Sequence, residues 1–261
     1  MFQNLRKSKK LLLIAMTCAT FAIAGCGSDT TKTTADNGPS VTWSETFDGT
    51  KTDFAVKSAP THAVSMSQAT TEMMLQLGLE DKMAGTAFKE EEIYPPLQAA
   101  YDKVKVLSEK WPSYEVFMSV KPDFATGWPD SFSKRAIPAD KMISQKVNIW
   151  IPESMLSTKA DLETNFSDMI KLGEIFGVKP KAEEWVSGQR KTLAAIQDKL
   201  KDLPRKRIFI YDSEDGQPFT AFEGYTTNIL KLIGADNVMS GLGVDKTWAK
   251  GSWETVIAQN P

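Results

Sequence analysis

The sequence predicts an α/β fold of two lobes, each with a central, mainly parallel sheet flanked by helices. Three observations support this prediction. Residues 62–86 read as strand, tight turn, helix and second strand, a βαβ unit that implies parallel strands. Short apolar runs and amphipathic stretches keep alternating over residues 91–150. After the two longest helical stretches a new apolar strand begins at Arg207, where a second lobe is expected to start.

The βαβ unit can be followed residue by residue. Residues 63–66 form a short apolar strand, and the hydroxyls of residues 67–70 can cap a helix N-terminus. The helix carries its methionines and a leucine on one face and ends at Gly78, which suits a left-handed cap. Residues 83–86 return as the second strand. In such a unit the ligand-binding loops lie at the carboxyl ends of the strands.

A hairpin is expected before this unit, over Val41–Phe54, because Asp48-Gly49 favours a two-residue hairpin turn. Further strands and helices follow the unit. We expect a helix over residues 91–101, a strand over 104–107, a helix over 113–119, a strand over 123–126, a helical stretch over 131–145 interrupted near Pro138, and a strand over 147–150.

Two long amphipathic helices are predicted in the middle of the chain, over residues 161–176 and 181–200. Gly177–Pro180 is expected to separate them. The second lobe then opens. It is predicted to contain a strand over 207–211, a helix over 225–233 that ends at Gly234, and a helix over 252–259.

Residues 1–25 read as a secretion signal, because four basic residues precede an apolar run that is too short to span a membrane. The run ends Ile23-Ala24-Gly25-Cys26. This sequence resembles the bacterial lipobox, in which the cysteine is diacylated and becomes the mature N-terminus. We therefore expect Cys26 to anchor the protein outside the cytoplasm on the bacterial cell membrane, with the polar residues 26–40 as a flexible tether.

The composition excludes several classes of protein. A chain of 261 residues with 41 % hydrophobic content suits a globular protein of two domains. Removal of the signal leaves 27 basic against 33 acidic residues, a net charge of −6. Nucleic-acid binding needs a concentrated basic face and is not expected. Cys18 leaves with the signal, so the mature chain keeps one cysteine and forms no internal disulfide.

Three motifs, in order along the chain, resemble one family. Residues 67–78 show Ser-x-x-x-Thr-Glu, a helix and Leu-Gly. Residues 113–126 show Ser-x-Glu, an apolar helix, Lys-Pro-Asp and a strand. Residues 248–261 contain a Trp-Glu pair that opens a helix ending in Asn-Pro. Together these motifs resemble the cobalamin- and iron-siderophore-binding proteins of ABC importers.

This resemblance implies a fold in which a long helix is the only link between two lobes. It divides the chain into an N-terminal lobe over residues 41–157, linking helices over 158–203 and a C-terminal lobe over 204–261. The family pattern continues beyond Asn-Pro with another strand and more helices. We therefore expect the C-terminal lobe of this chain to be truncated.

The resemblance also implies a transporter partner. In the family one glutamate per lobe docks on arginines of the permease dimer, which works with its ATPase subunits. Here those residues are Glu72 and Glu254, each expected at the first or second position of a helix. An alternative is that each glutamate merely complements the dipole of its helix N-terminus.

Aromatic and polar residues gather at predicted strand ends or in the loops after them. We expect ligand contacts from Ser67, Gln68, Trp111, Trp128, Ser131, Phe219, Phe222, Tyr225 and Trp248. So many rings suit a large, flat or greasy chelate, although each ring singly could be packing. Arginine is scarce in these loops, which disfavours a strongly anionic catecholate complex and favours a hydroxamate siderophore complex or a corrinoid. A haem would need an axial ligand, for which Tyr211 or Tyr225 could serve.

The sequence offers little for catalysis or for a bare metal ion. His62 is the only histidine, so neither a Ser-His nucleophile elsewhere nor a multi-histidine metal site is expected. Residues 90–92 are three glutamates before a predicted helix, where carboxylates suit the macrodipole. We expect no enzyme, no resident metal and no cofactor.

The sequence therefore predicts a monomeric, lipid-anchored receptor that binds an iron-siderophore-type or cobalamin-type chelate between its lobes and delivers it to an ABC permease. Two other readings stay open. The chain could be an exported chelate-processing enzyme, although it shows no nucleotide or flavin motif, or a structural or signalling surface lipoprotein.

Overall fold

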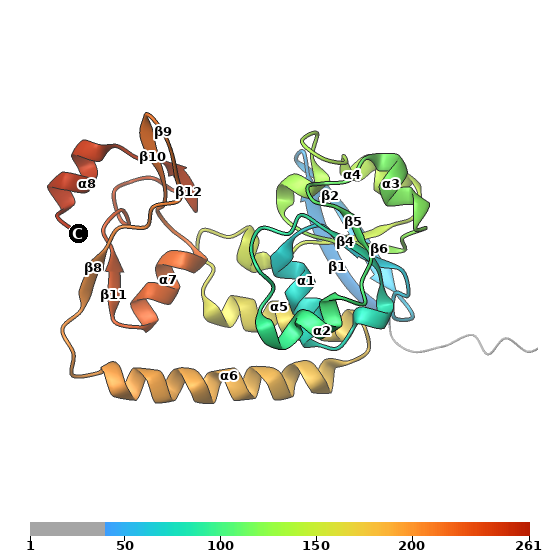
Figure 1. Ribbon diagram of the computed structural model, residues 1–261, viewed down its shortest axis with the longest axis horizontal. Helices are drawn as coiled ribbons and strands as arrows, with labels where there is room; N and C mark the ends of the chain where they lie inside the picture. The colour runs from blue at the N-terminus through green and yellow to red at the C-terminus, as the bar shows by residue number, and fades with distance from the viewer. Residues whose placement is uncertain (1–39) are drawn as a thin grey trace, which may run out of the picture. The chain divides into compact units, whose positions relative to one another are not determined.

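The computed structural model describes residues 40–261 (Figure 1). Their strands form four sheets, of five, three, two and two strands. The predicted signal, the lipid attachment at Cys26 and nearly all of the predicted tether lie outside the described residues. No helix within residues 40–261 is long and apolar enough to cross a membrane.

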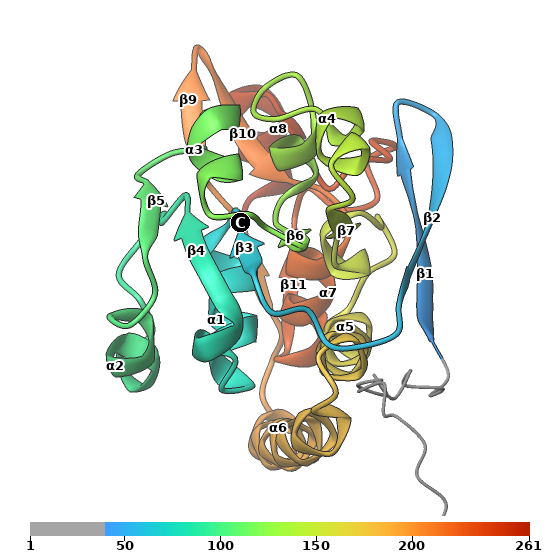
Figure 2. The same cartoon turned by 90° about the vertical axis from the view of Figure 1, so that its right-hand side faces the viewer.

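A five-stranded parallel sheet forms the centre of the N-terminal region, which we define as residues 41–157. Its strand order is β5-β4-β3-β6-β7, and Figure 2 shows these strands side by side. The strands are β3 (Ala63–Ser65), β4 (Met83–Ala87), β5 (Val106–Ser108), β6 (Phe124–Thr126) and β7 (Asn148–Trp150), and all four pairings are parallel. The predicted parallel α/β fold is confirmed for this region.

Helix α1 (Gln68–Gln76) follows β3 as the sequence predicts. The Ser67 hydroxyl accepts a hydrogen bond from the Thr70 backbone N–H at 3.2 Å, which satisfies one of the free donors at the helix start. Met73 and Met74 are buried on the face toward the core. Gly78 adopts φ +64° just after the helix, the left-handed conformation that glycine allows at low cost.

The predicted hairpin is also confirmed. Strands β1 (Val41–Phe47) and β2 (Thr50–Val56) pair antiparallel, and Asp48 and Gly49 between them both have positive φ, as a type I′ turn requires. The Trp43 indole N–H donates to the Ile149 carbonyl at 2.7 Å. This bond holds the hairpin against β7.

Two predicted helical stretches differ from the structure at proline residues. The helix expected over 91–101 is wrong in its first half: a 3₁₀ turn, η2 (Pro95–Leu97), leads into the short α2 (Gln98–Tyr101). Pro95 and Pro96 supply no backbone donors for an earlier helix. The stretch expected over 131–145 divides into η3 (Pro129–Phe132) and α4 (Ala139–Ser144), because Pro138 ends the irregular part. Helix α3 (Tyr114–Ser119) lies where it is expected.

Helices α5 (Leu162–Ile175) and α6 (Lys179–Leu200) confirm the two long helices. The segment between the two helices is shorter than predicted, because α6 begins at Lys179 and includes Pro180. Pro180 is the second residue of α6, where the missing N–H of proline needs no partner. The helices pack closely at Gly173, where a Cβ atom would lie 2.7 Å from the Ala182 Cβ. Between β7 and α5, the loop that leaves the sheet contains η4 (Glu153–Met155).

The C-terminal region, which we define as residues 206–261, has two small sheets. Strands β8 (Lys206–Ile208) and β11 (Ala235–Asn237) are parallel, with α7 (Tyr225–Leu232) preceding β11. A second, antiparallel sheet has the order β12-β10-β9, and the sequence analysis did not predict it. Its strands are β9 (Ser213–Asp215), β10 (Gln217–Ala221) and β12 (Trp248–Lys250), and α8 (Trp253–Gln259) ends the region.

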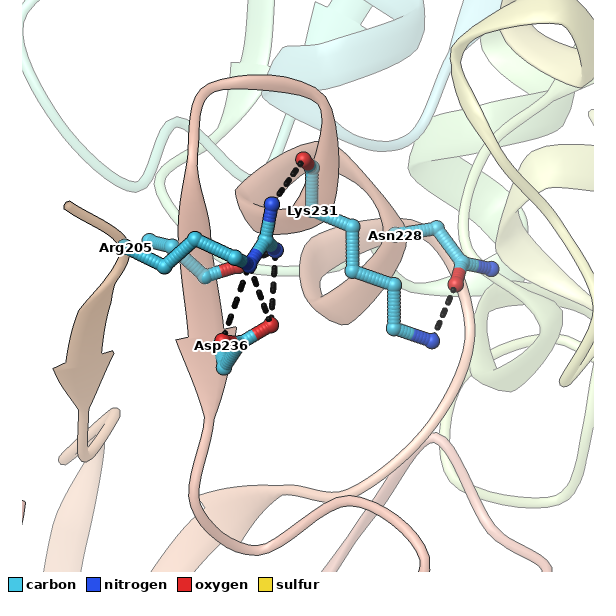
Figure 3. A network of polar contacts seen from close by, with 5 residues as sticks. Arg205, Asn228, Lys231 and Asp236 are labelled. Atoms are coloured by element: carbon cyan, nitrogen blue, oxygen red, sulfur yellow. Dashed lines mark hydrogen bonds and ion pairs between the residues drawn. The ribbon is translucent and has the colours of Figure 1, made fainter. Parts of the chain in front are cut away.

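Arg205, which directly precedes this region, and Arg207 on β8 each bond to later segments of it. Arg205 donates through its Nε to both Asp236 carboxylate oxygens, and its other nitrogens reach the carbonyls of Lys231 and Ala235 (Figure 3). It thereby closes the C-terminus of α7, where free carbonyls favour a cation. Arg207 donates to the carbonyls of Gln259 and Asn260 at the end of α8. Both arginines have structural partners.

Glu45, on β1, is a buried carboxylic acid. Its Oε1 accepts a hydrogen bond from the Ile151 backbone N–H at 3.0 Å. Burial raises the pKa of Glu45 from its ordinary 4.5 to about 7, and repulsion from Glu153 and Asp168 adds to that effect. The folded protein therefore holds a proton that the unfolded chain releases between about pH 4.5 and 7. Stability contributed at this site falls as the pH rises through that window.

We therefore expect Glu45→Gln to raise the free energy of unfolding by about 2–3 kcal/mol at pH 8 and by less than about 1 kcal/mol at pH 5. The amide keeps the oxygen that accepts from Ile151 but carries no charge. Urea unfolding at both pH values measures the difference. Glu184→Gln, at an exposed position of α6, is the charge-matched control. Parallel pH profiles for the wild type and Glu45→Gln would contradict this account.

Candidate ligand-binding site

The strand order of the N-terminal sheet locates a crevice. From the central β3 the chain moves outward to β4 and β5 and then crosses back to β6 and β7 on the other side. Ligands of open parallel sheets bind outside the carboxyl ends of the strands at such a switch point. Here that point lies between the start of α1, after β3, and residues 127–130, after β6.

A cavity of about 530 Å³ lies at this point, and we call it the main pocket. This volume is within the range of small-molecule sites. Its lining comes from α1, from η3 and η4, from α5 and from the C-terminal region. The residues are Ala69, Met73, Trp128, Pro129, Asp130, Ser154, Met155, Asn165, Glu223, Tyr225, Thr226, Thr247 and Trp248.

Three of the predicted ligand-binding residues line this pocket: Trp128, Tyr225 and Trp248. Trp128 lies two residues after the end of β6, Tyr225 is the first residue of α7, and Trp248 is the first residue of β12. The Trp128 indole N–H donates to the Glu90 carboxylate at 3.2 Å, which fixes the edge of that ring. The Trp248 ring stacks on Phe219, with centroids 6.2 Å apart.

Four predicted residues of the N-terminal region do not line the main pocket. Ser67 is fully buried as the cap of α1, and the buried Ser131 hydroxyl donates to the Met66 carbonyl at 3.2 Å. Trp111 donates to the same carbonyl at 3.1 Å and stacks on Phe88. The Gln68 side chain forms hydrogen bonds with other residues of the protein. These side chains shape the loops around the pocket.

Gln68 and Glu72 together hold the loop that follows β4. The Gln68 side-chain oxygen accepts from the backbone N–H groups of Glu90 and Glu91, and its nitrogen donates to Glu92 and to Glu72. Glu72 Oε1 accepts from the Tyr94 N–H at 3.2 Å. Glu72 is the fifth residue of α1, so the expectation that it lies at the first or second helical position is wrong.

The two predicted phenylalanines of the C-terminal region do not line the main pocket. Phe222 is 3 % exposed and packs in a core cluster with Val238, Met239 and Val256, while Phe219 supports the Trp248 ring from β10. Glu254 is the second residue of α8, as expected, and is exposed.

Several residues that line the main pocket were not predicted from the sequence. Met73 was noted only for its place on one face of the predicted helix, and Asn165 lies on α5, away from any strand end. Asp130 and Glu223 follow β6 and β10, so the rule that ligands bind at strand ends could have indicated them. Thr226 and Thr247 carry no signal that separates them from ordinary surface threonines.

The charged side chains that line the main pocket are both acidic. Among residues 40–261, Asp130 and Glu223 are the only charged residues that line it, and no lysine or arginine of that range does. Asp130 is paired with Arg135, and Glu223 accepts hydrogen bonds from the Ser240 hydroxyl and the Gly241 N–H. A strongly anionic ligand would lose its water in this pocket without gaining a direct contact with a cation of the described lining.

Tyr225 lines the main pocket, and the Asp168 carboxylate on α5 is near enough to influence its hydroxyl electrostatically. Burial raises the pKa of Asp168, whose carboxylate accepts from the backbone N–H groups of Glu153 and Ser154, each at 2.9 Å. Burial, together with the Asp168 charge, raises the pKa of the Tyr225 hydroxyl. The Tyr225 phenol therefore stays protonated at neutral pH. Within residues 40–261 no group of three or more histidine, cysteine, aspartate or glutamate side chains could hold a metal ion.

A parallel sheet with a pocket at its switch point, lined by three aromatic rings among other side chains and completed by residues of a second α/β region, is typical of a solute receptor. Residues 64–261 match the family model described as periplasmic binding protein, so the chain belongs to that family. Proteins of this family are the substrate-binding components of ABC transporters and are not enzymes.

Similar proteins are known by sequence and by structure. The chain is 25 % identical to the ABC transporter substrate-binding lipoprotein YvrC of Bacillus subtilis, over 98 % of this chain and 79 % of that protein. It is 25 % identical to the vitamin B12-binding protein of Vibrio vulnificus, over 79 % and 71 %.

Two solved structures extend the comparison. A periplasmic binding protein from Veillonella parvula is 97 % identical and superimposes with a TM-score of 0.84, over 86 % of this chain and 76 % of that one. A protein of the Fe³⁺-hydroxamate transport system of Saccharomonospora viridis is 19 % identical, with a TM-score of 0.66 over 84 % and 77 %, which shows the shared fold.

Proposed function

We propose that this protein binds a near-neutral metal chelate in the main pocket, either a ferric hydroxamate or a corrinoid, and delivers it to the permease dimer of an ABC importer. The observation that carries the proposal is the lining of the pocket: three aromatic residues from both regions and no cation. Rings cover the large apolar face of such a chelate, and the absence of lysine and arginine disfavours an anionic one. The names of a B12-binding relative and a hydroxamate-transport neighbour support the same ligand classes.

Haem is a poorer candidate. An axial tyrosine binds iron as the phenolate, but burial and Asp168 raise the pKa of Tyr225 and so disfavour that form. Tyr211, the other candidate ligand, is 53 % exposed and does not line the main pocket.

Native mass spectrometry of the protein purified from its own host tests the proposal. We expect a bound, coloured chelate whose mass identifies it as a ferric hydroxamate or a corrinoid. A chelate that is chemically altered during incubation would instead indicate a processing enzyme. A protein that stays empty when it is offered both chelate classes would favour a structural or signalling lipoprotein.

We also propose that Cys26 carries a lipid that holds the receptor at the membrane. Because the thiol is the acyl acceptor, Cys26→Ala should leave the precursor uncleaved or release the protein from the membrane fraction. Cell fractionation with an immunoblot measures both outcomes. Cys18→Ala changes the other cysteine of the chain and should leave processing unchanged. Normal processing and membrane partition of Cys26→Ala would refute the anchor.

A further inference from the structure

A second cavity, of about 340 Å³, adjoins the main pocket, and we call it the side pocket. It lies among α1, α5, α6 and residues 94–97. Ala69, Met73 and Asn165 line both cavities, so the two meet across these three side chains. Its volume is at the lower end of the range of small-molecule sites.

Three carboxamide side chains, each from a different helix, line the side pocket: Gln76 of α1, Asn165 of α5 and Gln189 of α6. The hydrogen bonds among residues 40–261 include none made by these three side chains, although each offers two donors and an acceptor. By contrast, both ends of Gln68 and of Asn237 are bonded to the protein. The three amides remain available to a bound molecule.

Besides the three amides, the side pocket is lined by apolar side chains, by the tyrosine Tyr94 and by one carboxylate. Met169 and Trp185 form walls, and Glu72 is the only charged residue in the lining. The Oε1 atom of Glu72 already accepts from Gln68 and Tyr94, and no lysine or arginine lines the cavity. Such a cavity suits methylene groups that end in N–H donors, and it disfavours an anion, which would lose its water beside a carboxylate.

We propose that the side pocket holds an arm of the ligand that carries amide or ammonium N–H groups, while the chelate itself lies in the main pocket. This inference rests on the proposed function and narrows its ligand. It favours a linear ferric hydroxamate with a pendant arm over a cyclic one without an arm, and over a corrinoid.

Quenching of tryptophan fluorescence tests the inference with two probes: a linear ferric trihydroxamate that has a free ammonium arm, and a cyclic ferric trihydroxamate that has none. We expect the wild type to bind the linear probe about 10-fold more tightly or better, about 1.4 kcal/mol. Gln76→Leu combined with Gln189→Leu should abolish that preference and leave the affinity for the cyclic probe unchanged. The pair Gln145→Leu and Gln197→Leu, exposed positions outside both cavities, should keep it.

The contradicting results are distinct. Equal affinity of the wild type for both probes, or a preference that persists in the Gln76 and Gln189 variant, overturns the arm site and leaves the proposed function intact. Binding of a corrinoid alone has the same consequence. If no chelate of either class binds, the proposed function falls and the arm site falls with it.

Discussion

Replacing Glu72 and Glu254 together should abolish uptake of the chelate and stimulation of the transporter ATPase. We propose, from the resemblance to the importer family, that each glutamate docks on arginines of one permease subunit. Charges at the rim of an interface control association with the partner more than they control a distant pocket. The affinity for an armless chelate should therefore stay unchanged in the double variant.

The structure makes glutamine the better replacement at one of these positions. Glu72→Gln keeps the side-chain oxygen that accepts from the Tyr94 N–H, so it removes the charge without releasing the loop. Glu254 is exposed near the start of α8, and either alanine or glutamine serves there. Transport assays in the host, with Glu115→Gln and Glu184→Gln as exposed acidic controls, measure the effect. Normal transport by the double variant would remove both residues from the docking surface.

Replacing Trp128 or Trp248 by alanine should weaken chelate binding by about 1–3 kcal/mol, roughly 5- to 150-fold in Kd. Both rings line the main pocket, and Trp248 is 36 % exposed. A ring that is open to solvent in the empty pocket loses its contacts with water only when the ligand covers it. The thermal midpoint of the ligand-free protein should therefore move little.

Phenylalanine at position 128 is the matched control. Trp128→Phe keeps an aromatic face but loses the indole N–H that donates to Glu90. It should retain most of the affinity if stacking is the cause. A fall in the thermal midpoint with unchanged affinity would mean that the two tryptophans stabilise the fold and do not contact the ligand.

Local chemistry made much of the N-terminal region predictable. The cap at Ser67, the glycine at position 78 and the Asp48-Gly49 turn are short-range features whose geometry depends on neighbouring residues alone. The rule that ligands bind at the carboxyl ends of parallel strands predicted that Trp128 lies near the pocket, because its loop follows a buried strand at the switch point. These predictions needed no knowledge of distant contacts.

The remaining features depend on contacts between distant segments. Gln68 was expected at the ligand and Glu72 at the permease, and the sequence did not indicate that both also bind a loop 22 residues further along the chain. Phe222 follows β10 on the side that packs into the core, and a single strand end does not reveal which side that is. Asn165 reaches the pocket only because α5 packs beside it.

Calorimetric titration of the wild type with three chelates tests the central claim most directly. A neutral ferric hydroxamate, a cobalamin and a strongly anionic ferric catecholate are compared in one buffer. We expect one of the first two to bind with a Kd of about 1 μM or below, and the catecholate to bind at least about 100-fold more weakly, because no cation lines the main pocket. Catecholate binding as tight as that of the better neutral chelate, or no binding of either neutral chelate, would contradict the account.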